Sequence, residues 1–419
     1  MSDSSELAAR IVSAFAGGTP LAIKGGSSKA FLSPRLDPQN EVIDTSSHNG
    51  VVSYEPTELV ITARAGTPIG ELKKVLAAEG QELPFDPPEF NGSDTLGGVV
   101  ACGAAGPCAP YRGGVRDFML GTRIINGRGE VLRFGGEVMK NVAGYDVSRL
   151  QVGAFGSLGL LLDVSLKVLP AHESEASRVF EMKLSQITEL IQKTERRPLP
   201  LQGCSVVPGF STQASGAGRV VLRFAGSQAA VSKAVEEVGG DQMDDAETFW
   251  KSIRDMKLPF FTSSSNSSSG IESTSESTTR LWRFTVAPTV AVEDFLNTLP
   301  KGSGDGDEAE TDYVLANGGR VRWIRSSASS EAMVEHAGRF KAGLSLMDGL
   351  SRQFSNTAPK QHAQMSDLQL RIKAAFDPGN ILNRGVLPFA RNSVSAENAK
   401  TRHELPEVKA LESVIETGH

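Results

Sequence analysis

Glycine is concentrated in three short segments between residues 24 and 159, and this clustering constrains the fold more than any other feature. The segments are Lys24-Gly25-Gly26-Ser27-Ser28-Lys29, residues 94–106 and residues 144–159. Because glycine has no Cβ atom, main chain at such positions can lie against a flat ligand. Tight packing between a helix and a strand would explain any one cluster. Three clusters in one domain favour a bound ligand.

The first segment directly follows a predicted strand at 21–24. Consecutive small residues there allow backbone N–H groups to turn inward and hold a pyrophosphate, with hydroxyls and a lysine nearby. No GxGxxG motif lies between a strand and a helix, and no GxxxxGK[ST] motif occurs. The sequence therefore supports neither a Rossmann dinucleotide site nor a P-loop.

Local patterns predict the elements around these segments. Thr67 and Pro68 are expected to begin a helix, with Thr67 as its N-cap, and Gly80 is expected to end it. Its buried face is predicted to hold Ile69, Leu72, Val75 and Leu76. Thr95 precedes a small-residue helix or turn at 96–105. Further strands are predicted at 41–44, 51–54, 59–63, 119–126, 130–134 and 158–169, and further helices at 229–238, 331–341 and 365–376.

Composition argues against several kinds of site. Cys102, Cys108 and Cys204 are too few for a self-contained iron–sulfur cluster, and the dispersed histidines predict no metal site. His336, alone on a predicted helix, is expected at the surface. A net charge of −6 argues against nucleic-acid binding. No run of ~20 apolar residues predicts a membrane span, and Met1–Arg10 lacks secretory-signal features, so a cytoplasmic protein is expected.

Residues 144–159 read GYDVSRLQVGAFGSLG, which resembles the GYDLxxLxVGSxGTLG signature of FAD-linked hydroxyacid dehydrogenases of the vanillyl-alcohol-oxidase type. The stretch 94–106 resembles that family's TIGGNVAxNAGG segment, and residues 376–383 resemble its C-terminal FDPxGILNPG element. Within the family, residues 135–146 and 317–323 closely resemble the FAD-binding subunits of bacterial-type glycolate oxidases.

The resemblance implies FAD contacts in all three segments. The first would hold the pyrophosphate, the second would line the flavin and ribityl chain, and the third would lie near the adenosine or the ring edge. The implied contacts are Gly25, Gly26, Ser27, Ser28, Lys29, Thr95, Gly97, Gly98, Gly103, Gly106, Gly156, Gly159 and Leu160. Some relatives attach FAD through a histidine near the first loop; here the next histidine is His48, so non-covalent binding is implied. Arg384 departs from the family, which has proline there.

The implied fold class is α+β: a two-lobed, non-Rossmann FAD-binding domain of the vanillyl-alcohol-oxidase type with a smaller α+β cap domain. We expect the FAD-binding domain at 1–170, the substrate-side cap domain at 171–330, a C-terminal segment packing near the flavin at 331–390 and a polar tail at 391–419. Residues 262–279, rich in Ser and Thr, and residues 301–312, rich in Gly and acidic side chains, are predicted to be disordered insertions.

Oxidation of a small 2-hydroxy acid needs a cation for the carboxylate, a base for the hydroxyl proton and a flavin to accept hydride. Candidates for the cation are Arg112, Arg116, Arg322 and Arg325, although most arginines are structural or solvated. No residue stands out as the base, so the catalytic residues stay unassigned.

The resemblance implies the FAD-binding subunit of a glycolate oxidase complex, which oxidises glycolate to glyoxylate. Its expected partners are a catalytic FAD-linked subunit and an iron–sulfur subunit, with at most peripheral membrane association through them. Two alternatives remain: a self-sufficient FAD-dependent dehydrogenase for another 2-hydroxy acid such as D-lactate, and a non-catalytic scaffold with a vestigial flavin site.

Overall fold

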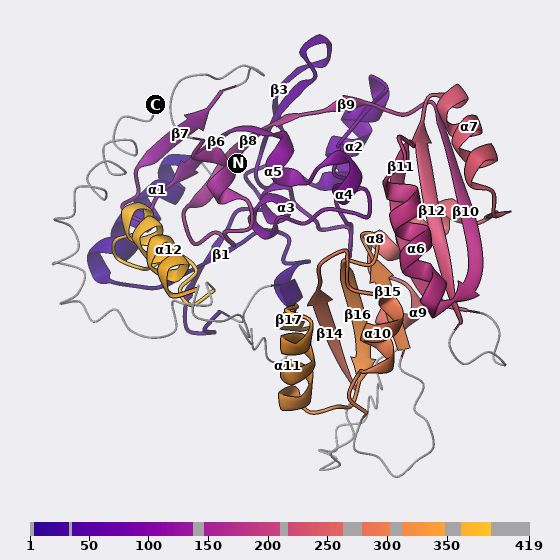
Figure 1. Cartoon of the computed structure of the whole chain (residues 1–419). Coiled ribbons are helices and arrows are strands. Elements are labelled where there is room, and N and C mark those ends of the chain that lie inside the picture. Colours follow the sequence, from indigo (N-terminus) through magenta and orange to yellow (C-terminus); the bar gives the residue numbers. More distant parts are fainter. Residues whose placement is uncertain are drawn as a thin grey trace, which may run out of the picture. The chain divides into compact units, whose positions relative to one another are not determined.

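The computed structural model describes residues 4–32, 36–136, 146–209, 217–262, 279–301, 312–347 and 362–386. The chain forms two compact units (Figure 1). Unit 1 comprises Met1–Ala105, Gly113–Ala171 and Lys360–His419, and unit 2 comprises Gly106–Arg112 and His172–Pro359. The predicted insertions at 262–279 and 301–312 lie largely outside the described residues, and the tail at 391–419 lies wholly outside them.

Unit 1 contains a five-stranded antiparallel sheet in the order β3-β4-β8-β6-β7. Its strands are β3 (Val51–Glu55), β4 (Val60–Arg64), β8 (Leu160–Lys167), β6 (Met119–Ile125) and β7 (Val131–Gly135). The central strand β8 is buried on both faces, because Leu161 and Val164 belong to one core cluster and Leu160 and Leu162 to another. Its burial explains why the sequence there reads as one apolar run.

Helices α1 (Ser4–Gly17) and α2 (Ile69–Ala78) each bury one face in unit 1. Two of the predictions for α2 are wrong. Its N-cap is Pro68, because the hydroxyl of Thr67 instead exchanges hydrogen bonds with the backbone of Gly50. Val75 is 36% exposed, so the buried face consists of Ile69, Leu72 and Leu76.

Several short elements complete unit 1. Helices α3 (Leu96–Cys102) and α5 (Val115–Phe118) pack into its main core, and strand β5 (Gln81–Glu82) pairs with β9 (Leu169–Pro170). In unit 2, helix α4 (Ala109–Arg112) contacts the eight-stranded sheet described below.

Strand β1 (Leu21–Lys24) pairs in parallel with β2 (Glu41–Asp44) on one side and with the C-terminal segment on the other. On the second side, Leu21 N donates to Ile381 O at 2.7 Å and Asn383 N donates to Leu21 O at 3.0 Å. Helix α12 (His362–Phe376) leads into this C-terminal segment.

A buried ion pair holds the C-terminal turn in place. Asp377 is 1% exposed, pairs with Lys373 and accepts hydrogen bonds from the backbone N–H groups of Ile381 and Leu382. The Lys373 ammonium also donates to Ser157 O at 2.7 Å and to Leu382 O at 3.0 Å. Apart from each other, the hydrogen-bond partners of these two buried charges therefore come from the C-terminal turn and from the loop before β8.

Unit 2 is built on an eight-stranded antiparallel sheet in the order β13-β10-β12-β11-β15-β16-β14-β17. Its strands are β10 (Ser174–Lys183), β11 (Leu201–Pro208), β12 (Ala217–Gly226), β13 (Asp241–Gln242), β14 (Arg280–Thr285), β15 (Asp312–Ala316), β16 (Val321–Ser326) and β17 (Gly343–Leu346). Helices α6 (Leu184–Glu195), α7 (Gln228–Val238), α10 (Val292–Asn297) and α11 (Ser330–Arg339) pack on one face. Helices α8 (Ala246–Arg254) and α9 (Pro259–Thr262) pack on the other.

The expectation that His336 lies at the surface is wrong. His336 is 5% exposed and packs against the rings of Phe284, Phe295 and Phe340. Burial lowers the pKa of His336, which favours the neutral imidazole in this apolar setting.

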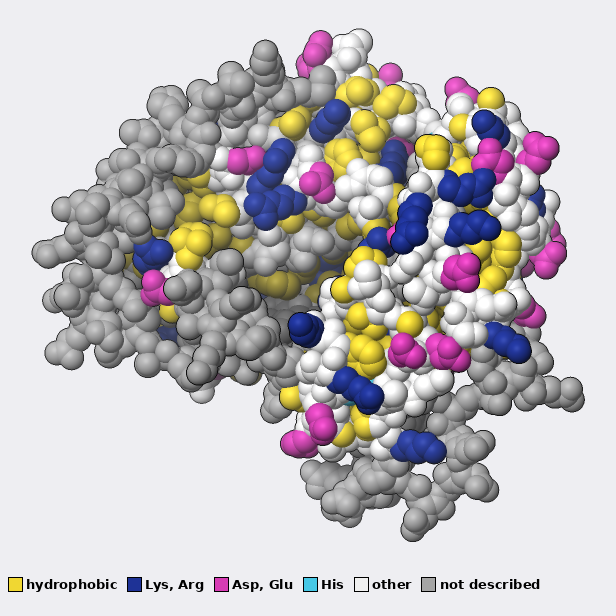
Figure 2. Space-filling model, in the orientation of Figure 1, with side chains coloured by type: hydrophobic (Ala, Val, Ile, Leu, Met, Phe, Trp, Pro, Cys, Tyr) yellow, Lys and Arg dark blue, Asp and Glu magenta, His cyan; other side chains and the backbone are white. Residues whose placement is uncertain are grey.

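On the face shown in Figure 2, charged side chains of both signs are interspersed across the described residues, with small apolar patches between them. Among the helices that the structure describes, none has the length and apolar character needed to cross a membrane.

Replacing Asp377 with alanine should lower the free energy of unfolding by ~3–5 kcal/mol, because it leaves the Lys373 charge buried and two backbone donors without an acceptor. Urea or thermal denaturation of the full chain measures this change. Glu247→Ala is the control: it removes a solvent-exposed i,i+4 pair with Lys251 and should change stability by less than ~1 kcal/mol. Equal effects of the two substitutions would contradict the structural role of Asp377.

Candidate functional site: a glycine-lined cavity in unit 1

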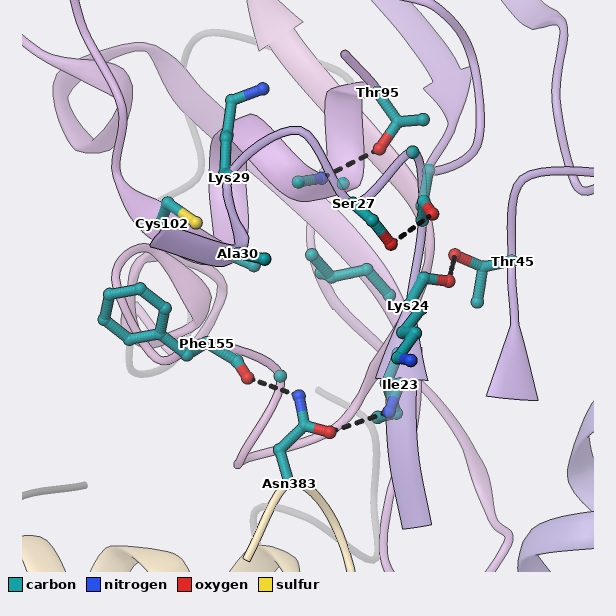
Figure 3. Close-up of a pocket in the computed structure, with 18 of the residues that line it drawn as sticks. Ile23, Lys24, Ser27, Lys29, Ala30, Thr45, Thr95, Cys102, Phe155 and Asn383 are labelled. Atoms are coloured by element: carbon teal, nitrogen blue, oxygen red, sulfur yellow. Dashed lines mark hydrogen bonds between the residues drawn. The ribbon is translucent and has the colours of Figure 1, made fainter. Parts of the chain in front are cut away.

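A cavity of about 320 Å³ lies in unit 1 at the end of β1 (Figure 3). Segments far apart in the sequence form its walls. The lining residues are Ile23, Lys24, Gly25, Gly26, Ser27, Ser28, Lys29, Ala30, Leu36, Thr45, Ala65, Thr95, Gly97, Gly98, Ala101, Cys102, Phe155, Gly156, Gly159, Leu161 and Asn383. They include apolar side chains, hydroxyls and backbone amides, which together suit a ligand with a flat apolar part and a polar chain.

The loop after β1 offers its backbone to the cavity. Within the described part of the chain, the N–H groups of Gly25–Lys29 donate no hydrogen bond to a backbone carbonyl. Ser27 has a positive φ of 54°, which turns the loop sharply. Successive amides left available in such a turn form an anion-binding concavity, so the loop fits a pyrophosphate.

Glycine is required in this loop because other backbone lies very close. A Cβ atom on Gly26 would lie 1.5 Å from the carbonyl oxygen of Ser93, and one on Gly25 would lie 2.7 Å from the hydroxyl of Thr95. The first and second glycine-rich segments therefore touch each other, and the glycines allow both to reach the same cavity.

Thr95 connects the second segment to the cavity. It is the N-cap of α3, the helix that begins where the sequence predicts a helix or turn, and its hydroxyl accepts a hydrogen bond from Gly98 N at 3.2 Å. Gly97 has a packing role, since a Cβ atom there would lie 2.8 Å from the Cβ of Ala65. Gly97 therefore allows α3 to pack closely against Ala65 and also lines the cavity.

The loop sequence suggests that a lysine lies near the pyrophosphate, but the Lys29 ammonium forms an ion pair with Asp94 instead. It is 5% exposed, and its ammonium lies 2.5 Å from a carboxylate oxygen of Asp94, which also accepts a bond from Ser28. Burial raises the pKa of Asp94, but hydrogen bonds from Lys29 and Ser28 outweigh it, so the net pKa is lowered. Figure 3 shows the Lys29 side chain directed away from Phe155 and Asn383. The Lys29 charge therefore anchors the loop to the second segment.

Asn383 closes the cavity from the C-terminal segment, and the sequence did not single it out as a site residue. Its Nδ2 donates to Phe155 O at 2.6 Å and its Oδ1 accepts from Ile23 N at 2.7 Å (Figure 3). One side chain therefore ties the end of β1 to the turn at Gly156. The signal that could have identified it was the resemblance of residues 376–383 to the family's FDPxGILNPG element, in which Asn383 matches the asparagine.

The cavity brings together ten of the residues that the sequence suggests for the cofactor: Gly25, Gly26, Ser27, Ser28, Lys29, Thr95, Gly97, Gly98, Gly156 and Gly159. It does not bring in the other three. Gly103 ends α3 with a positive φ of 62°, Leu160 is fully buried in the core, and Gly106 belongs to unit 2. Besides Asn383, the sequence missed ten lining residues whose role depends on tertiary structure: Ile23, Lys24, Ala30, Leu36, Thr45, Ala65, Ala101, Cys102, Phe155 and Leu161.

Two of the arginines considered for a substrate carboxylate have structural partners. Arg322 is 1% exposed and donates to the carbonyls of Gly319, Val290 and Ala291. Arg325 donates to the carbonyls of Phe260 and Phe261.

Comparison with known proteins agrees with this geometry. The family model described as "FAD binding domain" matches residues 1–135. A solved structure of alkyldihydroxyacetonephosphate synthase superposes with a TM-score of 0.66 at 15% identity, covering 90% of this chain and 74% of that one. The fold and site define a non-Rossmann FAD-binding flavoprotein of the vanillyl-alcohol-oxidase type with an α+β fold, as the sequence predicts.

The glycolate oxidase subunit GlcE of Escherichia coli (strain K12) is 38% identical over 370 residues, which span 87% of this chain and 93% of that protein. The chain therefore belongs to the GlcE family of glycolate oxidase subunits. The D-lactate dehydrogenase of Anaerostipes hadrus is 30% identical over 138 residues, and glycolate oxidase subunit GlcD of Bacillus subtilis (strain 168) is 29% identical over 127 residues. These two matches span only 29% and 27% of those proteins.

Gly26→Ala should weaken FAD binding by roughly tenfold or more, because the new Cβ would displace Ser93 and overpacking of this kind costs ~1–3 kcal/mol. Fluorescence titration of the flavin-free chain with FAD measures the affinity. Gly338→Ala is the matched control: it lies in α11, where a Cβ meets nothing within 4 Å, and should leave FAD affinity unchanged. An unaltered affinity in Gly26→Ala would remove the first loop from the site.

Asn383→Gly should also raise the dissociation constant for FAD by about tenfold, because it removes both hydrogen bonds of the side chain. Glycine accommodates the positive φ of 41° at this position, so backbone strain does not confuse the result. The control is Asn380→Gly, which also has a positive φ and lines no part of the cavity. Equal FAD affinity in the two variants would show that the Asn383 side chain does not shape the cavity.

Proposed function

We propose that the chain is the FAD-binding subunit of a glycolate oxidase complex that oxidises glycolate to glyoxylate. The observation that carries this proposal is the identity of 38% across 93% of the length of a glycolate oxidase subunit. The cavity supports it, since its glycines, hydroxyls and unpaired loop amides are present together in unit 1. Bound FAD would supply the electron acceptor for a two-electron oxidation of the carbon that bears the hydroxyl.

The residues of the cavity favour a subunit that works with partners. In the described part of the chain, the lining includes no histidine, aspartate or glutamate to take the hydroxyl proton. The described residues also include no group of three or more His, Cys, Asp or Glu side chains suited to a metal ion. We therefore propose a catalytic FAD-linked subunit and an iron–sulfur subunit as partners, with any membrane association made through them.

We propose that Gly25–Lys29 and the Thr95–Gly98 turn hold FAD without a covalent bond. The lining residues of the described cavity offer no histidine for attachment. A self-sufficient D-lactate dehydrogenase is less well supported, because the match to such an enzyme spans only 33% of this chain.

The purified complex should reduce an artificial acceptor with glycolate, whereas the isolated, FAD-loaded chain should be at least ~100-fold slower, the typical contribution of a general base. An absorption spectrum should show flavin on the isolated chain, and acid precipitation should release it into the supernatant. Pull-down from the native source with mass spectrometry identifies the partners.

Each competing function has its own signature in these measurements. Full turnover by the isolated chain would contradict the subunit role and favour a self-sufficient dehydrogenase. A colourless chain that gains no flavin absorbance on addition of FAD would favour a scaffold.

A further inference from the structure

Arg283 lies in the middle of β14, on the face of the large sheet opposite the main core of unit 2. Its neighbours along the strand, Trp282 and Phe284, are buried in that core, and side chains alternate between the two faces of a strand. Across the sheet, Arg283 stands opposite Trp323 of β16 and Ser345 of β17. Arg283 is therefore part of a small group formed by three adjacent strands.

The Arg283 guanidinium is partly buried, yet no described residue accepts a hydrogen bond from it or forms an ion pair with it. Its contact is with the ring of Trp323, over which its Cζ atom lies at 5.7 Å from the ring centre. Arg322 and Arg325, on the adjacent strand, each donate to backbone carbonyls. Burial lowers the pKa of Arg283, because desolvation disfavours the charged guanidinium.

The surroundings of Arg283 favour an anion. Arg325 lies on the same face as Arg283, and Asp312, the acidic residue in register with Arg325, belongs to β15, two strands away from β14. Phe261 packs edge-on against Trp323 at 5.6 Å and provides an apolar wall. A guanidinium that rests against an aromatic ring can still donate from its planar fork to the two oxygens of a carboxylate.

We propose that Arg283, supported by Trp323, binds the carboxylate of a small 2-hydroxy acid. The identity of the acid rests on the proposed function, whereas the anion site rests on the arrangement of β14, β16 and β17. Arg283 supplies a cation of the kind that hydroxyacid oxidation needs, and the described residues that line the cavity in unit 1 include no arginine. Ser345, the residue in register with Arg283 on β17, carries a hydroxyl that can serve as a further donor.

Calorimetric titration of the FAD-loaded full chain with oxalate, a carboxylate that this chemistry does not oxidise, tests the site. The wild-type chain should bind oxalate, and Arg283→Gln should bind it roughly tenfold more weakly or worse, because charge-assisted hydrogen bonds are lost. Arg283→Lys keeps the charge without the fork and should weaken binding severalfold. In the complex, both variants should raise the KM for glycolate.

Arg280→Gln is the matched control, since Arg280 lies on the same strand, is exposed and donates to Ser330. It should leave oxalate binding unchanged. The inference is overturned if the wild-type chain binds no oxalate, or if oxalate affinity survives in both Arg283→Gln and Arg283→Lys. If the complex does not oxidise glycolate while Arg283→Gln still weakens oxalate binding, the anion site stands and the proposed function fails.

Discussion

The hydrogen bonds between Leu21 and the C-terminal segment hold together two parts of the chain that lie far apart in the sequence, and the cavity depends on them. Strand β1 has β2 on one side and residues 381–383 on the other, so the loop that follows β1 begins from a strand supported on both sides. The Asp377–Lys373 pair holds the C-terminal turn, and its ammonium also binds Ser157 O beside the third glycine segment. One buried ion pair therefore positions two of the cavity's walls.

Features determined by neighbouring residues could be predicted from the sequence. The Thr95 cap, the first glycine loop and the buried strand β8 each leave a local pattern, and the structure has all three. Thr67 failed as an N-cap because its hydroxyl has a distant partner, Gly50, which no local pattern reveals. The fold class was predictable for a further reason, the family resemblance, and not from these patterns alone.

Residues that act through tertiary contacts could not be assigned in the same way. Asn383 lies 360 positions from Ile23, so its double hydrogen bond leaves no trace in spacing or periodicity. His336 sits among charged residues on α11, while the rings that bury it belong largely to β14 and α10. The same holds for the arginines. The sequence suggested Arg322 and Arg325 among the candidates for binding a substrate carboxylate, but both donate hydrogen bonds to backbone carbonyls that are distant in the sequence.

Buried charged side chains in this chain differ in whether described protein groups accept or donate hydrogen bonds to them, and this difference helps to distinguish structural from functional roles. Lys373, Asp377 and Arg322 are nearly inaccessible, and each receives a set of protein partners that offsets the loss of water. A charge kept in that way can be explained by the stability of the fold alone. Arg283 differs, because it is partly buried against an aromatic ring and no residue in the described part of the chain accepts a hydrogen bond from it. Since a desolvated guanidinium costs stability, the proposed anion gives a physical reason for the position of Arg283.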